Sequence, residues 1–309
     1  MSSVLKEVAN NNSLKLRRLA GRIGAEVQDL KLGTDLKAED IGALKAALRQ
    51  HRVIFLRDQH QLDDAAQEGF ARLFGELVPH PTEKVRAGST AILELDAASG
   101  NGKADQWHTD VTFVDAYPKY SILRAVEIPA FGGDTVWANT AAGYEDLSPQ
   151  LKQLAENLWA VHSNKYDCAA QRPRANDAER KHYQDVFAST QYETEHPVVR
   201  IHPDTGEKVL VLGYFIQRFV GHSNTDSAHL FSLLQDHVIR LENTVRWSWR
   251  KGDVAIWDNQ STQHYALNDY GDQNRIVRRS TIAGEVPVSV DGRRSVTRII
   301  GGPSRQAAE

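Results

Sequence analysis

Apolar residues recur at helical spacing in four parts of the chain. The groups, spaced mainly by three or four residues, are Ile41, Leu44 and Leu48; Ala66, Phe70, Leu73 and Phe74; Leu151, Leu154 and Leu158; and Leu230, Leu233, Leu234 and Val238. This spacing places the apolar side chains on one face of a helix. Asp63 and Asp64 precede the second group, and Ser148 with Pro149 opens the third, as is typical of helix starts. The pattern predicts four amphipathic helices.

Other segments are short, rich in β-branched and aromatic residues, and bounded by Gly, Asp or Pro. They span residues 52–56, 120–128, 134–138, 196–202, 208–212, 245–249, 253–257 and 276–284. This composition is typical of β-strands, and the stretch DQWHTDVTF at 105–113 resembles a strand as well. The helices gather at the start and in the middle of the chain instead of alternating with strands. The order favours a mainly β fold, a sandwich or barrel with helical additions, over a doubly wound parallel sheet.

The length of 309 residues allows one large domain or two ordinary ones. Between the two ends we find no low-complexity linker, charge block or internal repeat, so we expect a single domain over residues 1–309. Residues 1–13 are polar and Asn-rich, and residues 303–309 are small and polar. Both ends are therefore expected to be flexible.

Composition and charge narrow the class of protein. Hydrophobic residues make up 41% of the chain and charged residues 25%, the usual mixture of a soluble globular protein. The net charge of −3 offers no electrostatic attraction to nucleic acid or to an anionic membrane surface. The N-terminal segment has no apolar signal-peptide core, and no apolar run reaches about 18 residues, so export and membrane spanning are not expected.

The chain contains one cysteine, Cys168. A single cysteine rules out internal disulfides and a multi-cysteine metal cluster, and it suits the reducing cytoplasm. Any metal would therefore have to be bound by histidine and carboxylate ligands.

His108 and Asp110 are separated by one residue within the strand-like stretch at 105–113. Side chains at i and i+2 of a strand point to the same face, so the two would converge on one point. With a second histidine they would form the two-His, one-carboxylate facial triad of non-haem Fe(II) oxygenases. The pair alone is weak support, since a hydrogen-bonded surface pair is the alternative. The best third ligand among the twelve histidines is His264, between two strand-like segments.

An Fe(II) oxygenase without an organic redox cofactor needs two further electrons, which oxidative decarboxylation of a 2-oxoacid supplies. The distal carboxylate of a 2-oxo-dicarboxylate would need an arginine fork and a hydroxyl group. Arg275 and Thr135 are the candidates. The alternatives are that Thr135 is an ordinary strand residue, and that Arg275 and Arg279 are surface partners of nearby aspartates.

Seven motifs occur in the order known from one enzyme family. They are FLRDQ (55–59), FGEL (74–77), WHTDVTF (107–113), GGDTVWA (132–138), YEDLS (144–148), HPVVRIHPDTG (196–206) and AIWDNQSTQHYA (255–266). With their spacing they resemble the Fe(II)/2-oxoglutarate-dependent taurine dioxygenase family over nearly the whole chain. The resemblance implies a double-stranded β-helix, the cupin-like jelly roll, with iron at one end and a helical insertion covering part of it. It also implies a homo-oligomer, since the family tends to form dimers and tetramers.

The family's residue roles are carried over by these motifs. The iron ligands, which are the catalytic centre, fall on His108, Asp110 and His264. The contacts to the 2-oxoglutarate C5 carboxylate fall on Thr135 and Arg275, while Arg279 lies between the co-substrate and the anionic group of the primary substrate. His80 corresponds to a residue that donates to a sulfonate oxygen, although an isolated histidine is more often structural. Trp257 and Asn259 are expected to support the site or the core.

The pocket positions indicate the substrate. The family's partners for the ammonium group of taurine are replaced here by Glu83, Lys103 and Ala104, and Tyr214 with Phe215 offers bulk and apolar surface. This combination is similar to the alkylsulfatase dioxygenases of the family. Those enzymes use Fe(II), O₂ and 2-oxoglutarate to hydroxylate the carbon bearing the sulfate, and release aldehyde, inorganic sulfate, succinate and CO₂ for sulfur metabolism.

Three other functions remain open from the sequence. A taurine, alkylsulfonate or aryloxyalkanoate dioxygenase would share the iron site and differ in the pocket. A zinc hydrolase would use the same ligands but would need neither O₂ nor Arg275. A metal-free jelly-roll binding module is the alternative that is not an enzyme.

Overall fold

The computed structural model describes residues 14–97, 104–166 and 191–300. The expectations for the two chain ends, for Lys103 and for Cys168 therefore lie outside the described residues. The four predicted helices are confirmed, and the described ranges contain one further short α-helix. The helices are α1 (Ala38–His51), α2 (Asp64–Arg72), α3 (Thr140–Glu145), α4 (Pro149–Asn157) and α6 (Asn224–Val238). As the sequence indicated, the side chains of Asp63 and Ser148 cap the N-termini of α2 and α4.

In the part of the chain that the structure describes, the strands form one large sheet and three smaller ones, and all strand pairs are antiparallel except β2 with β3. The seven-stranded sheet contains, in spatial order, β1 (Lys15–Arg18), β2 (Ala25–Gln28), β3 (Val53–Leu56), β13 (Val254–Asp258), β5 (Tyr120–Glu127), β15 (Ile276–Ile282) and β4 (Leu93–Asp96). The three-stranded sheet contains β12 (Thr244–Trp247), β6 (Thr135–Asn139) and β14 (Thr262–Ala266). The prediction of a mainly β fold with helical additions is confirmed.

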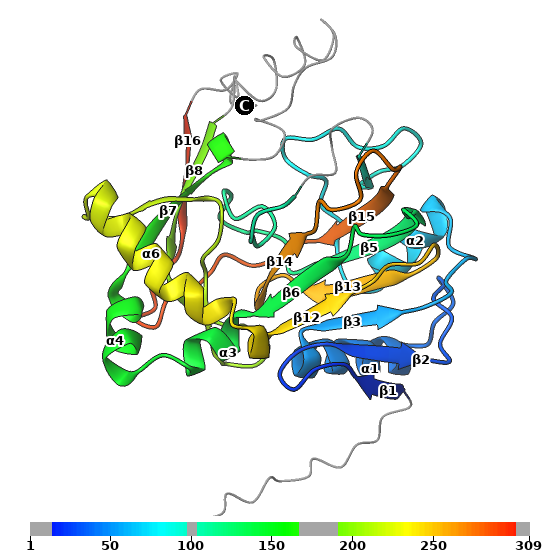
Figure 1. The fold of residues 1–309 in the computed structure, drawn as a ribbon, viewed down its shortest axis with the longest axis horizontal. Helices are drawn as coiled ribbons and strands as arrows, with labels where there is room; N and C mark the ends of the chain where they lie inside the picture. The colour runs from blue at the N-terminus through cyan, green and yellow to red at the C-terminus, as the bar shows by residue number, and fades with distance from the viewer. Residues whose placement is uncertain (1–13, 98–103, 167–190, 301–309) are drawn as a thin grey trace, which may run out of the picture.

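The two remaining sheets lie with the later helices. The four-stranded sheet contains β11 (Ile216–Phe219), β7 (Trp159–Ser163), β8 (Gln191–Pro197) and β16 (Val296–Ile300), and the two-stranded sheet contains β10 (Lys208–Leu210) and β9 (Val199–Ile201). Within the described residues there are also two short 3₁₀ helices, η1 (Asn164–Tyr166) and η4 (Leu241–Asn243). Figure 1 shows α3, α4 and α6 on the side of the four-stranded sheet, whereas α1 and α2 lie beside the large sheet.

The central strands are buried on both faces, which explains their nearly continuous apolar sequences. In β13, Val254 and Ile256 pack with α1 and α2, while Ala255 and Trp257 pack against residues of the three-stranded sheet. Alternate side chains of β3 divide between the same two clusters. This alternation separates a helix-facing core from a core between the two sheets, and the pocket described below opens within the second layer.

Two strand predictions were wrong in detail. The segment at 196–202 is divided between β8 and β9, because Pro197 has no N–H to continue the ladder and the chain passes from one sheet to another. The stretch at 105–113 is not a strand: only His108 forms an isolated bridge, and Asp110 to Phe113 form a turn. The reason lies at Val111, whose φ of 61° is left-handed.

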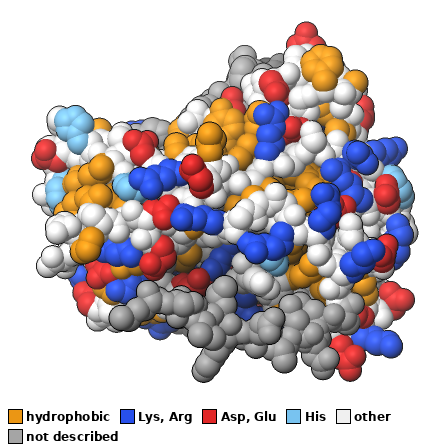
Figure 2. All heavy atoms as spheres, turned by 60° about the horizontal axis from the view of Figure 1, so that its bottom comes forward, with side chains coloured by type: hydrophobic (Ala, Val, Ile, Leu, Met, Phe, Trp, Pro, Cys, Tyr) orange, Lys and Arg blue, Asp and Glu red, His pale blue; other side chains and the backbone are white. Residues whose placement is uncertain are grey.

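The described helices are short, and none of them has the length together with the apolar composition that crossing a bilayer requires. On the face drawn in Figure 2, basic and acidic side chains are interspersed with apolar ones. This mixture agrees with the small net charge of −3.

Candidate metal and co-substrate site

A pocket between the large sheet and the three-stranded sheet brings all of the predicted site residues together. Its lining includes His80, His108, Asp110, Thr135, Tyr214, Phe215, His264, Arg275 and Arg279. The space, counted with its opening to solvent, is about 890 Å³. The structure therefore collects in one cavity residues that are separated by up to about two hundred positions in the sequence.

His108 and His264 are held opposite each other by backbone pairing. The N–H of each donates to the carbonyl of the other, with N···O distances of 3.0 and 2.8 Å, and the ring centroids lie 4.1 Å apart. Both Nε2 atoms lie 3.8 Å from the same carboxylate oxygen, Oδ1 of Asp110. All three residues are buried, and one ligand atom of each falls within 4.8 Å of the others.

Asp110 reaches this point through a turn, and not through the pleat of a strand that we expected. The turn after Asp110 contains the left-handed Val111, and the N–H of Val114 closes it by donating to the Val111 carbonyl at 3.2 Å. The sequence prediction of convergence was correct, but its geometric reason was wrong. A β-branched residue gives no signal of a left-handed backbone, because its propensity indicates a strand.

Hydrogen bonds orient the donor atoms toward the centre of the triad. Nδ1 of His108 donates to the Gln106 carbonyl at 2.7 Å, which fixes the tautomer and leaves the Nε2 lone pair available. The hydroxyl of Ser121 donates to Oδ2 of Asp110 at 3.0 Å, so Oδ1 is the oxygen that faces the two imidazoles. The Arg279 guanidinium donates to that same Oδ1.

The charges of the triad match those of a divalent-metal site. Burial raises the pKa of the Asp110 carboxyl, but Arg279, His264 and His108 together outweigh burial and hold this pKa below its usual range. Burial, with the neighbouring His108, lowers the pKa of His264 to about 3. At neutral pH the set therefore offers an ionised carboxylate and a neutral imidazole at position 264, the forms that bind metals.

The residues present fit the metal and co-substrate implied by the sequence. Two imidazole nitrogens and one carboxylate oxygen on one side of a cavity are the donor set of a two-His, one-carboxylate iron site. Nε of the buried Arg279 has no hydrogen-bond partner among the described residues, and this side chain lines the same cavity. A cationic group with an unmet donor beside the triad suits an anionic ligand.

Arg275 and Thr135 lie at a second part of the pocket. Nε of Arg275 donates to the Gly133 carbonyl at 3.1 Å, and Oγ1 of Thr135 accepts from Trp249 Nε1 at 3.0 Å. Gly133 has a φ of 70°, and a Cβ built there would lie 3.2 Å from Cδ and Nε of Arg275. The second glycine of the GGDT motif therefore allows the close approach of this side chain.

The alternative of surface ion pairs for the two arginines is wrong. Arg275 is 3% exposed and Arg279 is 7% exposed. Asp269 accepts from the Gly133 N–H and lies beside Arg246, while Arg279 pairs with Asp110. Burial lowers the pKa of Arg275, since removing the guanidinium from water disfavours its charged form.

The remaining predicted contacts lie around Phe113 and His108. Nδ1 of His80 is 3.2 Å from the Thr82 hydroxyl, and the ring stands edge-on to Phe113 with 6.2 Å between centroids. Phe215 is buried and lies edge-on to both His108 and Phe113, at 6.0 and 5.2 Å. Tyr214 lines the same pocket.

Two features of the site and its surroundings were missed by sequence reasoning. Its apolar wall also contains Leu93, Leu95, Leu123 and Val277, from β4, β5 and β15. Ser121, which lies outside the lining and donates to Asp110, was missed as well, because a serine in a strand-like segment that also contains Arg124 and Glu127 gives no signal in the sequence. Glu83 and Ala104, expected at the dismantled ammonium site, do line the pocket.

Comparisons with known proteins agree with this site. Residues 15–281 match the model of the family described as "Taurine catabolism dioxygenase TauD, TfdA family". An "alpha-ketoglutarate-dependent sulfate ester dioxygenase" of Pseudomonas putida is 60% identical, covering 92% of this chain and 94% of that protein. An "alkylsulfatase" of Acinetobacter baylyi is 54% identical, covering 93% and 90%. The crystal structure of a taurine dioxygenase from Burkholderia xenovorans has a TM-score of 0.78 at 36% identity, covering 94% and 96%.

Proposed function

Because the chain belongs to the TauD/TfdA family of dioxygenases, we propose that it is an Fe(II)- and 2-oxoglutarate-dependent dioxygenase acting on alkyl sulfate esters. The observation that carries the proposal is the similarity, over more than nine-tenths of the chain, to a sulfate ester dioxygenase and an alkylsulfatase. The buried triad, the two arginines and the apolar pocket support the same reading.

His108, Asp110 and His264 would hold the iron, and they are the catalytic centre of the proposal. Bound Fe(II), with O₂ and 2-oxoglutarate, supplies the oxidising equivalent that hydroxylates the carbon bearing the sulfate. The resulting hemiacetal sulfate collapses to an aldehyde and inorganic sulfate, while 2-oxoglutarate is converted to succinate and CO₂. Cleavage of the ester is then a consequence of oxidation and not of hydrolysis.

Arg275 and Thr135 would bind the distal carboxylate of 2-oxoglutarate. Arg275 is well placed for this role because its Nε is fixed on the Gly133 carbonyl, which orients the guanidinium plane. A fixed fork loses little freedom when it pairs with a carboxylate. The Thr135 hydroxyl accepts from Trp249, so its own hydrogen remains directed elsewhere and is free to be donated.

Arg279 and His80 would bind the sulfate group of the substrate. Arg279 contacts the carboxylate of Asp110, so an anion bound by its other nitrogen atoms lies next to the triad. Tyr214, Phe215 and the leucine-lined wall would surround the alkyl chain. With Glu83 and Ala104 where taurine dioxygenases hold the ammonium, a zwitterion has fewer matched partners than an alkyl sulfate.

The test is a product balance with Fe(II), O₂ and 2-oxoglutarate. We expect hexyl sulfate to give hexanal, sulfate, succinate and CO₂ in equal amounts, and taurine to be a poor substrate. Faster turnover of taurine, of hexanesulfonate or of an aryloxyalkanoate would keep the iron chemistry and overturn the choice of substrate. Sulfate release that continues without O₂ would favour a zinc hydrolase and overturn both.

We further propose that residues 1–309 act as a single domain in the cytoplasm, as a homo-oligomer and without a nucleic-acid partner. The small net charge supports the absence of a nucleic-acid partner, and the single cysteine supports the cytoplasmic location. Exposed apolar side chains such as Phe131 and Leu241, 67% and 85% exposed, are candidates for subunit contact. Light scattering of the purified chain tests the oligomeric state, and a monomeric mass would contradict it.

A further inference from the structure

The carboxamide of Asn259 is bonded to the backbone of Asp110 on both sides of that residue. Oδ1 of Asn259 accepts from the Asp110 N–H at 2.9 Å, and Nδ2 donates to the Asp110 carbonyl at 3.1 Å. Nδ2 also donates to the Pro118 carbonyl at 2.9 Å. The orientation of the amide is therefore determined, because the reversed amide would place donor against donor and acceptor against acceptor.

The backbone next to the Asp110 groups bonded by Asn259 has a strained conformation. Val111, directly after Asp110, has a φ of 61° and is 4% exposed. A left-handed backbone is unfavourable for a β-branched residue, and such a residue keeps it only where the surroundings impose it. Without outside support, the turn would relax toward an extended backbone, and the Asp110 carboxylate would turn with it.

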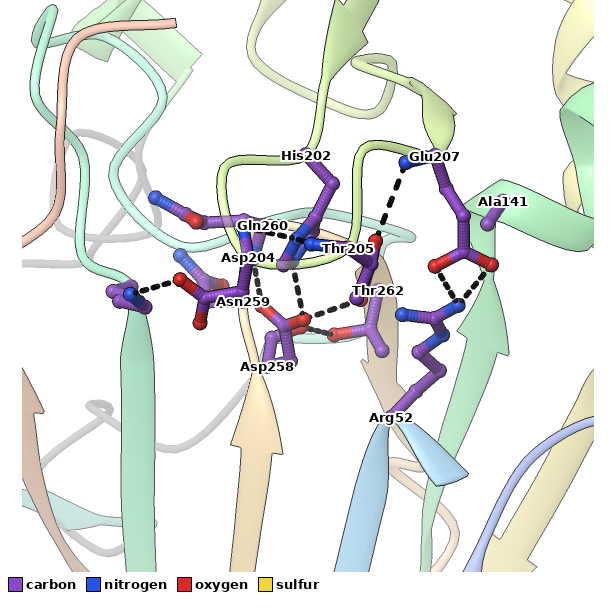
Figure 3. A network of polar contacts seen from close by, with 12 residues as sticks. Arg52, Ala141, His202, Asp204, Thr205, Glu207, Asp258, Asn259, Gln260 and Thr262 are labelled. Carbon is purple, nitrogen blue, oxygen red and sulfur yellow. Dashed lines mark hydrogen bonds and ion pairs between the residues drawn. The ribbon is translucent and has the colours of Figure 1, made fainter. Parts of the chain in front are cut away.

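Asn259 is itself held rigidly, since it belongs to a turn organised by Asp258. The Asp258 carboxylate accepts from the Gln260 N–H at 3.0 Å, from the Ser261 hydroxyl at 2.7 Å and from His202 Nε2 at 2.7 Å. Figure 3 shows His202, Asp258, Asn259 and Gln260 at the end of the strands, in one polar network. Asp258 and Asn259 are both buried.

The same turn is tied to the other ligands. The Thr262 hydroxyl donates to the Asp258 carbonyl at 2.8 Å, and the Thr262 carbonyl accepts from the Thr109 hydroxyl at 2.7 Å. Thr109 lies between the two ligands His108 and Asp110, and Thr262 begins the strand that carries His264. One turn thus contacts all three ligand-bearing segments.

We infer that Asn259 is a positioning residue for the metal site: its carboxamide holds the Asp110–Val111 backbone in the left-handed turn that aims Oδ1 at the two imidazoles. The inference rests on the proposed function for the identity of the site, and it goes beyond it by assigning the site's geometry to a residue that is not a ligand. Removing such an outer partner typically lowers metal affinity about 10- to 100-fold.

The experiment measures Co(II) binding by absorbance titration and thermal unfolding of the metal-free full-length chain. Asn259→Ala is compared with Asn243→Ala. Asn243 is also fully buried; its Nδ2 donates to the His237 carbonyl at 2.9 Å and its Oδ1 accepts from Arg22 at 2.7 Å. Asn243 is outside the pocket lining. We expect both variants to unfold at lower temperature, but only Asn259→Ala to lose about 10- to 100-fold in Co(II) affinity.

Co(II) affinity in Asn259→Ala equal to that of Asn243→Ala would overturn the inference and leave Asn259 a structural residue. If Asn259→Ala does not fold, Asn259→Ser leaves one hydroxyl in place and is expected to show a smaller loss in the same direction. Co(II) binding that survives His108→Ala would instead remove the metal site of the proposed function, and this inference with it.

A second variant tests the role of strain. Glycine adopts the left-handed conformation without steric cost. In Val111→Gly the turn therefore depends less on the hydrogen bonds from Asn259. In the Val111→Gly background, Asn259→Ala should lose less Co(II) affinity than it does in the wild-type chain. An equal loss in both backgrounds would contradict the link between Asn259 and the conformation of Val111.

Discussion

Arg275 directly precedes β15 and Arg279 lies in its middle, four residues further on, yet the two side chains contact different groups. Arg279 contacts the Asp110 carboxylate, whereas Arg275 is fixed on the Gly133 carbonyl away from the triad. Arg278, between them in the sequence, has the opposite orientation and pairs with Asp64 and Glu94. The segment 275–279 therefore presents two cations to the pocket and a third to the opposite face, beside Asp64 and Glu94, in agreement with the alternation of side chains along a strand.

This separation gives a prediction for co-substrate binding. Arg275→Ala should raise the KM for 2-oxoglutarate much more than the KM for the sulfate ester, because it removes the partner of a carboxylate that the iron does not bind. Loss of one partner of a buried charge pair costs about 2–5 kcal/mol. Arg275→Lys should raise this KM less than Arg275→Ala but not restore the wild-type value, since lysine lacks the planar guanidinium fork. Arg278→Ala is the matched control, and equal effects in Arg275→Ala and Arg278→Ala on this KM would contradict the assignment.

The triad gives a second prediction at the same scale. His108→Ala, Asp110→Ala and His264→Ala should each abolish turnover and leave the fold intact, because the core clusters that stabilise the chain do not include these side chains. Circular dichroism of each variant should match the wild type while bound iron falls to background. Full activity in any one of them would show that this residue is not a ligand.

Among the elements, β8 and the turn after Asp110 meet at a buried histidine. His196 lies in β8, where Nε2 bonds to the Thr112 carbonyl at 2.7 Å and Nδ1 to the Ser295 hydroxyl at 2.6 Å. Burial, which outweighs these contacts, lowers the pKa of His196 to about 3. The neighbouring His162 is also buried, with its ring centroid 5.0 Å away, and burial lowers its pKa as well.

These shifts predict how stability depends on pH. In the unfolded chain the pKa of His196 is about 6.5, so this side chain binds a proton below that pH. In the folded chain it stays neutral down to about pH 3. The free energy of unfolding therefore decreases as pH falls through this window. Each such proton lowers the free energy of unfolding by up to about 1.4 kcal/mol per pH unit. Urea titrations of the metal-free chain between about pH 6.5 and 5 measure this slope before most carboxylates titrate.

His196→Gln should be less stable but should show a shallower slope than the wild type, because one of the buried histidines is gone. His222→Gln is the control, since His222 is exposed and its replacement should leave the slope as it was. An unchanged slope in His196→Gln would mean that the histidine at position 196 does not contribute to the pH dependence.

The same elements show what the sequence could and could not predict. Helices and central strands were predictable, because burial of a whole face leaves a periodic or continuous apolar pattern. Strand β14 was not, since Gln263 is fully buried and is satisfied by a reciprocal amide pair with Gln235 of α6, at 2.6 and 3.2 Å. A polar residue whose partner is 28 positions away has no local signature.

The candidate site also contains residues that the sequence could predict and residues that it could not. The residues that would touch iron or ligand follow a motif with fixed spacing, so the sequence identified them. The residues that orient them depend on tertiary contacts: Ser121 on the far carboxylate oxygen and Asn259 on the Asp110 backbone. Sequence alone indicated Asn259 only as general support, because the left-handed Val111 that makes the support necessary is invisible in the motif.

For the molecule as a whole, the match to a solved taurine dioxygenase over 94% of the chain confirms the jelly-roll prediction. The pocket lies between two sheets, and its walls combine strand side chains, such as Leu93, Leu123 and Val277, with side chains from loops, such as His80 and Phe215. An anion fixed by Arg279 near the triad leaves the rest of a substrate to extend along Leu93, Leu95 and Phe215. The extent of this apolar wall should therefore limit the useful length of the substrate.

The last prediction follows from this limit. Each added methylene of a primary alkyl sulfate that reaches the apolar wall should contribute about 0.8 kcal/mol, or close to a fourfold gain in kcat/KM, until the wall is covered. Beyond that length the gain should level off, because further carbons extend into solvent. A series from ethyl to dodecyl sulfate, assayed by succinate release, measures the slope and the plateau. Constant kcat/KM along the series would contradict the alkyl-binding role of the wall.

With ¹⁸O₂, label should enter the aldehyde before it exchanges with water and should not enter the sulfate, because attack at carbon leaves all S–O bonds of the released sulfate intact. Label in the sulfate would place the attack at sulfur, where neither the triad nor the apolar wall would then have the role proposed for it.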